Sequence, residues 1–178
     1  MRRPPPPSDG EFAALVEASW GSLYRTAYLL VGQRRLAEDL VQDALARTYA
    51  SWSKVRDVDA APGYAHRVLV NTASSWFRKR SWREERPTDA VPEDLRAPGQ
   101  EHDASLRPTV LGALDRLAPR QRAVVVLSFY EDLSVAQTAE ALGISPGTVK
   151  SQTSDALSRL RDLLGDAVVP VTTGGPHD

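Results

Sequence analysis

Residues 134–164, SVAQTAEALGISPGTVKSQTSDALSRLRDLL, predict two helices joined by a tight turn. Ser134 suits the N-cap of the first helix, and Gln137 stands three residues on, where a capping box places Glu or Gln. Gly143 follows the last apolar residue and suits the left-handed position after a helix. Ser145 then suits the N-cap of a second helix whose first position is a proline. This arrangement is typical of a helix-turn-helix, which places its second helix in the major groove of DNA.

The composition of the chain limits its function class. It has 178 residues, no cysteine and 42% hydrophobic residues, which suffices for one medium domain or two small ones and excludes disulfides and thiolate metal sites. No apolar run approaches the roughly 18 residues of a membrane span, and the start MRRPPPPSDG lacks the features of a signal peptide. We therefore expect a soluble, cytoplasmic protein. Because the net charge is −1, DNA binding would depend on local basic patches or on a larger partner.

Helical periodicity dominates residues 11–86, which follow a predicted flexible tail at residues 1–10. The first helix ends before Gly32, and its apolar stripe consists of Phe12, Val16, Leu23, Ala27 and Leu30. A second helix is predicted at about 35–52, with an inner side formed by Leu40, Val41, Ala44, Leu45 and Thr48. Its outer side carries Glu38, Asp39, Gln42 and Asp43. Acids near a helix N-terminus interact favourably with the helix dipole.

A third helix is predicted at about 64–83, after a loop at 54–62, and is opened by Pro62 and Gly63. Residues 87–107 hold five acids, two arginines and three prolines, the composition of a flexible linker. A second helical block spans 108–166, and 167–178 form another tail. Within this second block, the apolar residues 123–130 predict a helix. A strand at VVVLSFY is the alternative, because β-branched residues favour strands. The sequence thus predicts an all-α fold of two small helical domains on a linker.

The second helix of the helix-turn-helix has an apolar side and a polar side. At 100° per residue, the apolar side consists of Val149, Ala156, Leu160 and Leu163. The opposite or flanking side consists of Lys150, Ser151, Ser154, Asp155 and Ser158. Lysine can contact phosphate or guanine, so this side predicts duplex DNA binding. The alternative is an ordinary capped helical hairpin with a solvated face.

The end of the third helix, WFRKRSWREER at 76–86, combines three aromatic residues with five basic residues against two glutamates. This pattern suits single-stranded nucleic acid, because bases stack on aromatic rings while the backbone meets positive charge. The alternative places Trp76 or Phe77 in the core and treats the basic run as a solvated helix end.

The sequence contains no recognisable catalytic or metal-binding constellation. Its histidines, His66, His102 and His177, are far apart, and no P-loop, dinucleotide fingerprint or nucleophile elbow occurs. We therefore expect a non-enzymatic protein with no cofactor and no metal.

Four segments, in this order, resemble bacterial sigma factors of the extracytoplasmic-function type. They are AEDLVQDAL (37–45), YAHRVLVNTASSWFRKR (64–80), LDRLAPRQRAVVVLSFYEDLS (114–134) and ALGISPGTVKS (141–151). The resemblance covers about residues 11–165. It implies a sigma region 2-like domain at 11–86 and a region 4-like domain at 108–166. Such a protein would bind core RNA polymerase, direct it to promoters through the −10 and −35 elements, and promote melting.

The resemblance also implies partners and residue roles. Docking on the clamp coiled coil of the polymerase would use Glu38, Asp39, Gln42 and Asp43. Reading and melting the −10 element, with a flipped base held by the 54–62 loop, would use Lys54, Arg56, Tyr64, Asn71, Ser75, Trp76, Arg78, Lys79 and Arg80. Binding the −35 duplex would use Arg120, Arg122, Thr148, Lys150, Ser151, Gln152, Ser154 and Asp155. The second domain would also contact the polymerase flap, and an anti-sigma protein is a further implied partner.

Three positions depart from the family pattern. Ser75 stands where relatives often carry Asp or Asn, which bears on the −10 preference, and Gln152 and Asp155 stand where many relatives have Arg. Asp155 would repel phosphate on a groove-facing side unless it accepts a hydrogen bond from a cytosine amino group.

Two rival functions would use the same motifs. The first is a free-standing helix-turn-helix regulator that acts without polymerase. The acidic helix and the single-strand pattern argue against this alternative. A degenerate sigma-like protein would bind polymerase without initiating transcription, an alternative that Asp155 and the low net charge keep open.

Overall fold

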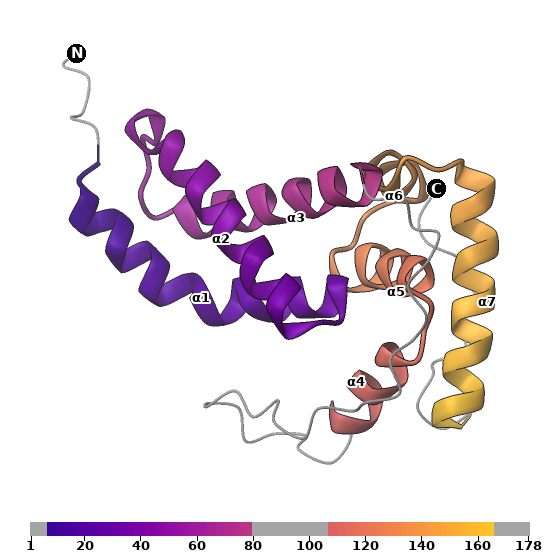
Figure 1. The fold of residues 1–178 in the computed structure, drawn as a ribbon. Helices are drawn as coiled ribbons and strands as arrows, with labels where there is room; N and C mark the ends of the chain where they lie inside the picture. Colours follow the sequence, from indigo (N-terminus) through magenta and orange to yellow (C-terminus); the bar gives the residue numbers. More distant parts are fainter. Residues whose placement is uncertain (1–6, 80–106, 166–178) are drawn as a thin grey trace. The chain divides into compact units, whose positions relative to one another are not determined.

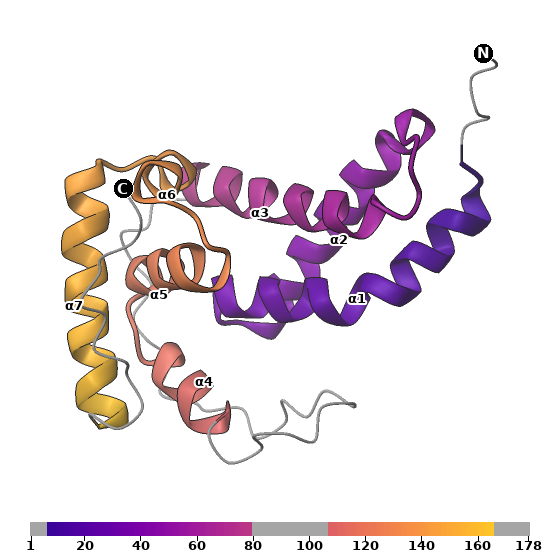
Figure 2. The same ribbon diagram turned by 180° about the vertical axis from the view of Figure 1, so that it is seen from behind.

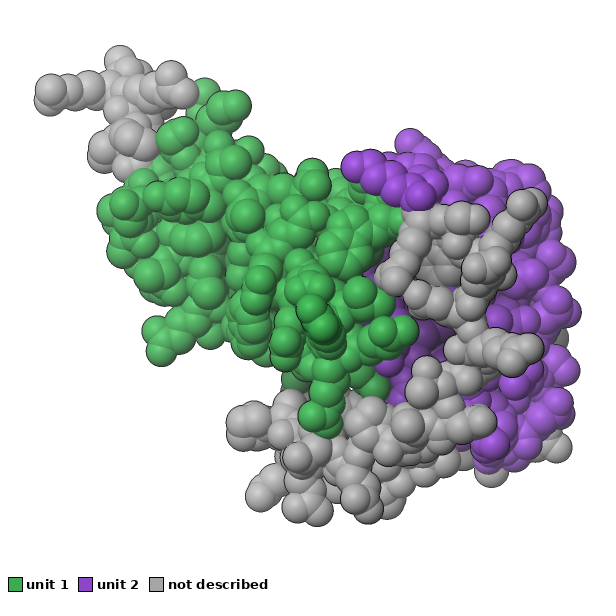
Figure 3. Space-filling model, in the orientation of Figure 1, with its two compact units in different colours: residues 1–28, 33–76 green, residues 29–32, 77–178 purple. Residues whose placement is uncertain are grey.

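The computed structural model describes residues 7–79 and 107–165, and all the regular secondary structure in these ranges is helical (Figures 1 and 2). This confirms the predicted all-α class for the described residues. Two compact units are distinguished, residues 1–28 with 33–76 and residues 29–32 with 77–178 (Figure 3). The predicted tail at 167–178 and all but the last residue of the predicted linker at 87–107 lie outside the described residues. No helix in the described ranges has the length and apolar character that crossing a membrane requires.

The first unit consists mainly of three long helices, α1 (Asp9–Val31), α2 (Arg34–Ala50) and α3 (Ala61–Lys79). The last three residues of α1 and of α3 are assigned to the second unit. The short 3₁₀ helix η1 (Trp52–Lys54) follows α2. Helix α1 begins two residues inside the predicted N-terminal tail, because Ser8 and Glu11 form a reciprocal cap. The Glu11 amide donates to Ser8 Oγ at 3.3 Å, and the Ser8 amide donates to Glu11 Oε2 at 2.7 Å. The helix ends before Gly32, whose φ of 74° is the left-handed conformation that glycine favours.

The predicted apolar stripes form the core of these helices. Leu23, Ala27 and Leu30 of α1 are at most 1% exposed, whereas Phe12 and Val16 are half-buried. All five residues predicted for the inner side of α2 are buried. Helix α3 completes the core with Ala65, Leu69 and Ala73.

One electrostatic prediction for α2 is wrong. The helix begins at Arg34, and its first turn holds no acidic residue. Glu38 and Asp39 lie in the second turn, where the influence of the helix dipole has decayed. These acids therefore do not stabilise the start of α2, and their side chains face solvent or a partner.

Helix α3 begins at Ala61, three residues before the predicted start. Its Pro62 and Gly63 lie in the first turn, where a missing proline N–H leaves no helical bond unmade. Further along, the hydroxyls of Thr72 and Ser74 donate to the carbonyls of Val68 and Val70 at 2.7 and 2.8 Å. Both hydroxyls are thus satisfied within the helix although their side chains are buried.

The second unit contains α4 (Arg107–Asp115), α5 (Pro119–Val125), α6 (Val135–Leu142) and α7 (Pro146–Leu164). A π-helical segment, η2 (Val126–Tyr130), continues α5. Helices α4, α5 and α6 all pack on α7, the long helix drawn in yellow-orange in Figure 1. The apolar run VVVLSFY lies in the end of α5 and in η2, so it is helical and the alternative of a strand is excluded. Its last two residues, Phe129 and Tyr130, are exposed.

The helix-turn-helix has the caps that its sequence predicts. Ser134 Oγ accepts from the Gln137 amide at 3.2 Å, and Gln137 Oε1 accepts from the Ser134 amide at 2.9 Å. Gly143 has φ 64° and ψ 38°, the left-handed conformation at the end of α6. Ser145 Oγ accepts from the Thr148 amide at 3.1 Å at the start of α7. The predicted capping box, glycine stop and second N-cap are all confirmed.

Candidate nucleic-acid and polymerase interfaces

Helix α7 exposes most of the residues predicted to meet duplex DNA. Lys150, Ser151, Ser154 and Asp155 are exposed, and Thr148 and Gln152 are half-buried. The opposite side is buried and consists of Val149, Thr153, Ala156 and Leu160, with Leu163 half-buried. The helix therefore presents one continuous polar side to solvent.

The polar side of α7 is ordered by its own hydrogen bonds at the start of the helix. The Thr148 and Ser145 hydroxyls lie 2.8 Å apart, and Ser151 Oγ donates to the Thr148 carbonyl at 3.1 Å. These bonds fix the side chains of Thr148 and Ser151 before any partner binds. A preformed helix start of this kind can present hydroxyls and Lys150 to a DNA groove.

The two predicted arginines of α5 lie in different environments. Arg120 is exposed. Arg122 is only 4% exposed, and its Nη1 donates to Asp115 Oδ1 at 2.5 Å. A phosphate contact by Arg122 would require its guanidinium to leave this ion pair, so Arg120 is the better placed of the two.

Helix α3 places the residues predicted for single-stranded DNA on two different sides. Tyr64, Asn71, Ser75 and Arg78 are separated by seven, four and three residues, so they share one side; all are exposed except Ser75, which is half-buried. Lys79 is exposed as well, and Arg80 lies outside the described residues. Trp76 instead continues the buried series Ala65, Leu69 and Thr72, the side that packs inward. Phe77 is buried, as the core alternative for this segment expected.

An open pocket of about 410 Å³ lies where η1 and the following loop meet the start of α3. It brings together three residues that the sequence predicted, Lys54, Arg56 and Tyr64. Four further lining residues, Val55, Asp57, Ala60 and Ala61, belong to the 54–62 loop that was expected to hold a flipped base, although they were not named individually. Ser51 lies before that loop and was missed. Two cations, an aromatic ring and a carboxylate around an apolar floor can hold a planar polar group such as a nucleobase.

The floor of this pocket is held in place by the start of α1. The buried Trp52 donates from Nε1 to the Ser8 carbonyl at 2.9 Å, and the Phe12 and Trp52 rings pack edge to face with centroids 5.2 Å apart. Val55 and Ala61 line the pocket and pack in the same apolar cluster as Trp52. Residues more than forty positions apart thus cooperate to shape the loop.

Tyr49 makes a second set of contacts with the start of α1, beside those of Trp52. The Tyr49 hydroxyl donates to Asp9 Oδ1 at 3.0 Å, and the Tyr49 ring lies 4.9 Å from that of Phe12. The hydrogen bond to the Asp9 carboxylate, and its negative charge, raise the pKa of Tyr49 above its ordinary value of 10.0.

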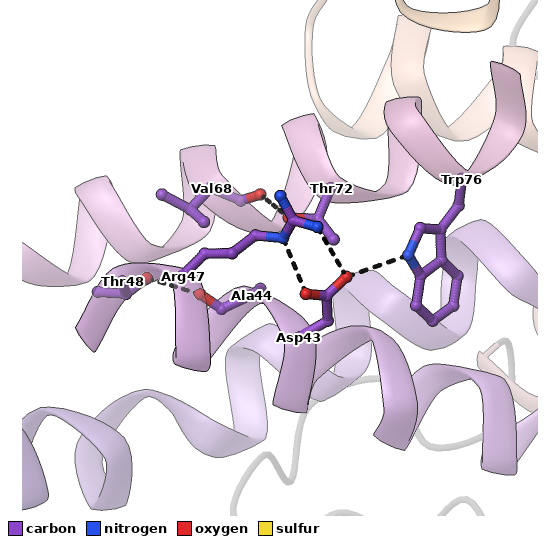
Figure 4. Close-up of polar contacts among 7 residues, drawn as sticks. All are labelled: Asp43, Ala44, Arg47, Thr48, Val68, Thr72 and Trp76. Carbon is purple, nitrogen blue, oxygen red and sulfur yellow. Dashed lines mark hydrogen bonds and ion pairs between the residues drawn. The ribbon is translucent and has the colours of Figure 1, made fainter. Parts of the chain in front are cut away.

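The predicted polymerase-binding residues of α2 are not equivalent. Glu38, Asp39 and Gln42 are exposed. The Asp43 side chain is only 32% exposed and accepts from Arg47 Nε at 2.8 Å and Arg47 Nη2 at 3.3 Å. It also accepts from Trp76 Nε1 at 3.2 Å, so a residue predicted for polymerase and a residue predicted for DNA meet inside one unit (Figure 4).

Arg47 was not singled out in the sequence, although its spacing of four residues from Asp43 on a helix predicts an ion pair. The hydrogen bond to Asp43, and the charge of that carboxylate, raise the pKa of Arg47 above its ordinary value. The Arg47 side chain is 54% exposed, so this ion pair contributes little to stability.

Comparison with known proteins agrees with both units. Residues 15–83 match the family description "Sigma-70 region 2", and residues 113–162 match "Sigma-70, region 4". The chain is 44% identical over 154 residues to the RNA polymerase sigma-E factor of Streptomyces coelicolor, with 86% of each chain covered. It is 30% identical over 138 residues to the sigma factor SigV of Bacillus subtilis, with 78% of this chain and 81% of that one covered.

The chain belongs to the extracytoplasmic-function sigma factors of the sigma-70 family. The sigma factor directs RNA polymerase to promoters for transcription initiation, and it is not an enzyme. A solved structure supports the fold: the sigma factor RpoE of Bartonella quintana, in complex with the anti-sigma factor NepR, matches with a TM-score of 0.56 and 27% identity. That match covers 86% of this chain and 96% of the solved one.

Proposed function

We propose that this sigma factor divides promoter recognition between its two units. The first, from 11 to 86, would bind the −10 element as single strand and help to melt it. The second, from 108 to 166, would bind the −35 element as duplex. The observation that carries the proposal is the pocket beside Tyr64, because it supplies a receptor for an unpaired base next to the exposed side of α3.

The pocket has the chemistry that an extruded base needs. Its Tyr64 ring offers a stacking surface, Lys54 and Arg56 offer charge to the flanking phosphates, and Asp57 and Ser51 can hydrogen-bond the base edge. Extrusion costs a few kcal/mol, which stacking at about 1–3 kcal/mol per base can offset in part. Asn71 lies two turns further along α3, on the same side as Tyr64, where it would contact a neighbouring base.

The −35 contact rests on the polar side of α7. Lys150 supplies its charge, Thr148, Ser151 and Ser154 supply hydroxyls, and Arg120 of α5 would contact the adjacent backbone. Gln152, Asp155 and Arg122 complete the proposed set, with the Asp115 ion pair limiting Arg122. Because the whole chain carries a net charge of −1, this contact is expected to be weak without polymerase.

The partners follow from the same division. The exposed Glu38, Asp39 and Gln42 of α2 would dock on the clamp coiled coil of core polymerase, with Asp43 at the edge of that surface. The second unit would contact the flap. An anti-sigma protein is a further proposed partner, as for the RpoE–NepR complex. We expect these partners to meet in the cytoplasm.

Run-off transcription with purified core polymerase tests this proposal. The template library contains promoter-like sequences with varied −10 and −35 elements. We expect the sigma factor to create start sites that core polymerase lacks, each with a shared sequence pair at −10 and −35. Binding to polymerase without any new start site would support the degenerate sigma-like alternative and contradict the proposal.

A further inference from the structure

Asp43 and Trp76 were predicted to serve different partners, yet they are bonded to one another across α2 and α3. We propose that Asp43 is a positioning residue whose carboxylate holds the Trp76 indole against α2 and so fixes how α3 presents its DNA-facing side. This inference rests on the proposed −10 function of α3. The Asp43 carboxylate is bonded to a tryptophan of the same chain, so we infer that its main role is to anchor α3 rather than to bind polymerase.

The geometry around Asp43 is that of a shared acceptor. Its Oδ2 atom receives the Trp76 indole N–H at 3.2 Å and Arg47 Nη2 at 3.3 Å, while Oδ1 receives Arg47 Nε at 2.8 Å (Figure 4). Arg47 lies one turn after Asp43 and donates to its carboxylate from two nitrogens, which sets the plane of the carboxylate. The orientation of Oδ2 toward the indole is therefore prepared by α2 itself.

The hydrogen bond to Asp43 favours the observed position of the Trp76 indole. An indole N–H can only donate, and Trp76 is half-buried, so releasing the N–H would leave a donor without its anionic acceptor. A hydrogen bond to a charged acceptor is stronger than one between neutral groups. The bond thus ties α3 to α2 at the end of the helix where the basic residues begin.

Fixing Trp76 also fixes its neighbours on α3. Ser75 immediately precedes it, Asn71 lies five residues before it, and Arg78 lies two residues after it. Since an α-helix is stiff over this length, holding one inward side chain sets the rotation of the outward ones. Further back, Thr48 and Thr72, both buried, bond only to their own helices in Figure 4, so those contacts set no rotation between the two helices.

Exposure separates Asp43 from its neighbours on α2. Glu38, Asp39 and Gln42 are exposed and suit a partner surface, whereas Asp43 turns toward α3. A positioning role and a polymerase contact predict different consequences for the same substitution. Loss of the anchor would impair DNA opening with polymerase affinity preserved, whereas loss of a docking contact would weaken polymerase binding itself.

The test compares four variants of the full-length protein. Asp43→Ala removes the acceptor, Asp43→Asn keeps an acceptor oxygen, and Trp76→Phe keeps a ring without the N–H donor. Gln42→Ala is the matched control for polymerase docking, because it is the adjacent exposed residue of α2. The indole ¹H–¹⁵N resonance of Trp76, assigned by its absence in Trp76→Phe, reports the bond directly and needs no polymerase.

We expect the Trp76 indole resonance to shift and to exchange faster with water in Asp43→Ala, and to move much less in Asp43→Asn. With core polymerase, Asp43→Ala and Trp76→Phe should each reduce open-complex formation about tenfold, the lower end for one hydrogen bond to a charged group. The double variant should lose no more than either single one, since both remove the same bond. Polymerase affinity should fall clearly less for Asp43→Ala than for Gln42→Ala.

Three results would overturn the inference. They are an unchanged indole resonance in Asp43→Ala, a loss of polymerase affinity equal to that of Gln42→Ala, and additive losses in the double variant. The proposed function fails separately: if the wild-type protein forms no open complex on any template, that function is contradicted, and the indole measurement still decides whether Asp43 holds Trp76.

Discussion

Asp155 is exposed one turn after Ser151 on the polar side of α7, where the proposed −35 contact lies. A carboxylate there is repelled by phosphate unless it accepts a hydrogen bond from a cytosine amino group. The side chain therefore either weakens the duplex contact or selects for one base. Substitution separates these two effects.

Replacing Asp155 by arginine should strengthen binding of the polymerase complex to −35 duplex DNA. The change removes a repulsion and adds a phosphate contact, so the slope of log affinity against log salt should steepen by about 0.9 for that contact. Fluorescence anisotropy with a labelled duplex over a salt series measures both quantities. Asp162→Arg, which alters the net charge equally from an exposed position two turns away, is the control. Equal effects of the two variants would mean that Asp155 does not approach DNA.

The placement of the site residues could be predicted from the sequence only where it depends on local spacing. The exposed polar side of α7 follows from its helical period, and the predicted Lys150, Ser151, Ser154 and Asp155 all lie on it. The bond between Asp43 and Trp76 could not be predicted, because it joins residues 33 positions apart through the packing of two helices. The inward direction of Trp76 was therefore left open between a core and a DNA-stacking role.

Elements whose ends carry their own caps were predicted well. The α6–α7 turn follows the capping box, Gly143 and Ser145, all of which act within a few residues. The start of α1 was predicted two residues late although Ser8 and Glu11 form a capping box, because this signal lies in the stretch that was predicted as a tail. The start of α3 was predicted three residues late, and that of α2 one residue late, which is within the usual uncertainty of helix ends. The 54–62 loop was expected to hold a flipped base, but the packing of its apolar residues against Trp52 and the start of α1 could not be predicted, because it joins distant parts of the chain.

The junction of α1 and η1 offers a direct test of how the pocket is held. Trp52 is 3% exposed, and its indole donates to the Ser8 carbonyl, so Trp52→Phe removes that bond and part of a packed ring. We expect the free energy of unfolding to fall by about 1–3 kcal/mol. Denaturant titration measures this loss, and Trp20→Phe, at a position 38% exposed, should change stability by less than about 0.5 kcal/mol.

The same pair of variants reports on function. If the N-terminal brace shapes the pocket, Trp52→Phe should also reduce base unstacking at −10, measured with 2-aminopurine in the template, at temperatures where the variant stays folded. Trp20→Phe should leave it unchanged. Normal unstacking in a destabilised Trp52→Phe protein would mean that the pocket does not depend on this brace.

At the scale of the whole molecule, the proposed function needs two DNA-binding units on one chain. The fold class and the existence of two helical blocks could be predicted from the sequence, because apolar periodicity identifies helices and the composition of 87–107 interrupts it. The family followed from four ordered segments. The net charge of −1 means that the chain as a whole has no electrostatic attraction for DNA. We therefore expect polymerase to bring both DNA-binding units to the promoter.

The central claim is that α3 opens the −10 element while α7 holds the −35 duplex. The measurement that tests it most directly compares Asn71→Ala and Lys150→Ala in complex with core polymerase, on templates found active in run-off transcription. Open-complex formation is followed by 2-aminopurine fluorescence at −10, and −35 duplex affinity by anisotropy. We expect Asn71→Ala to reduce opening about tenfold, as for one lost base contact of about 1–3 kcal/mol, with duplex affinity retained. Lys150→Ala should reduce duplex affinity first, and equal losses of both quantities in both variants would contradict the division of labour.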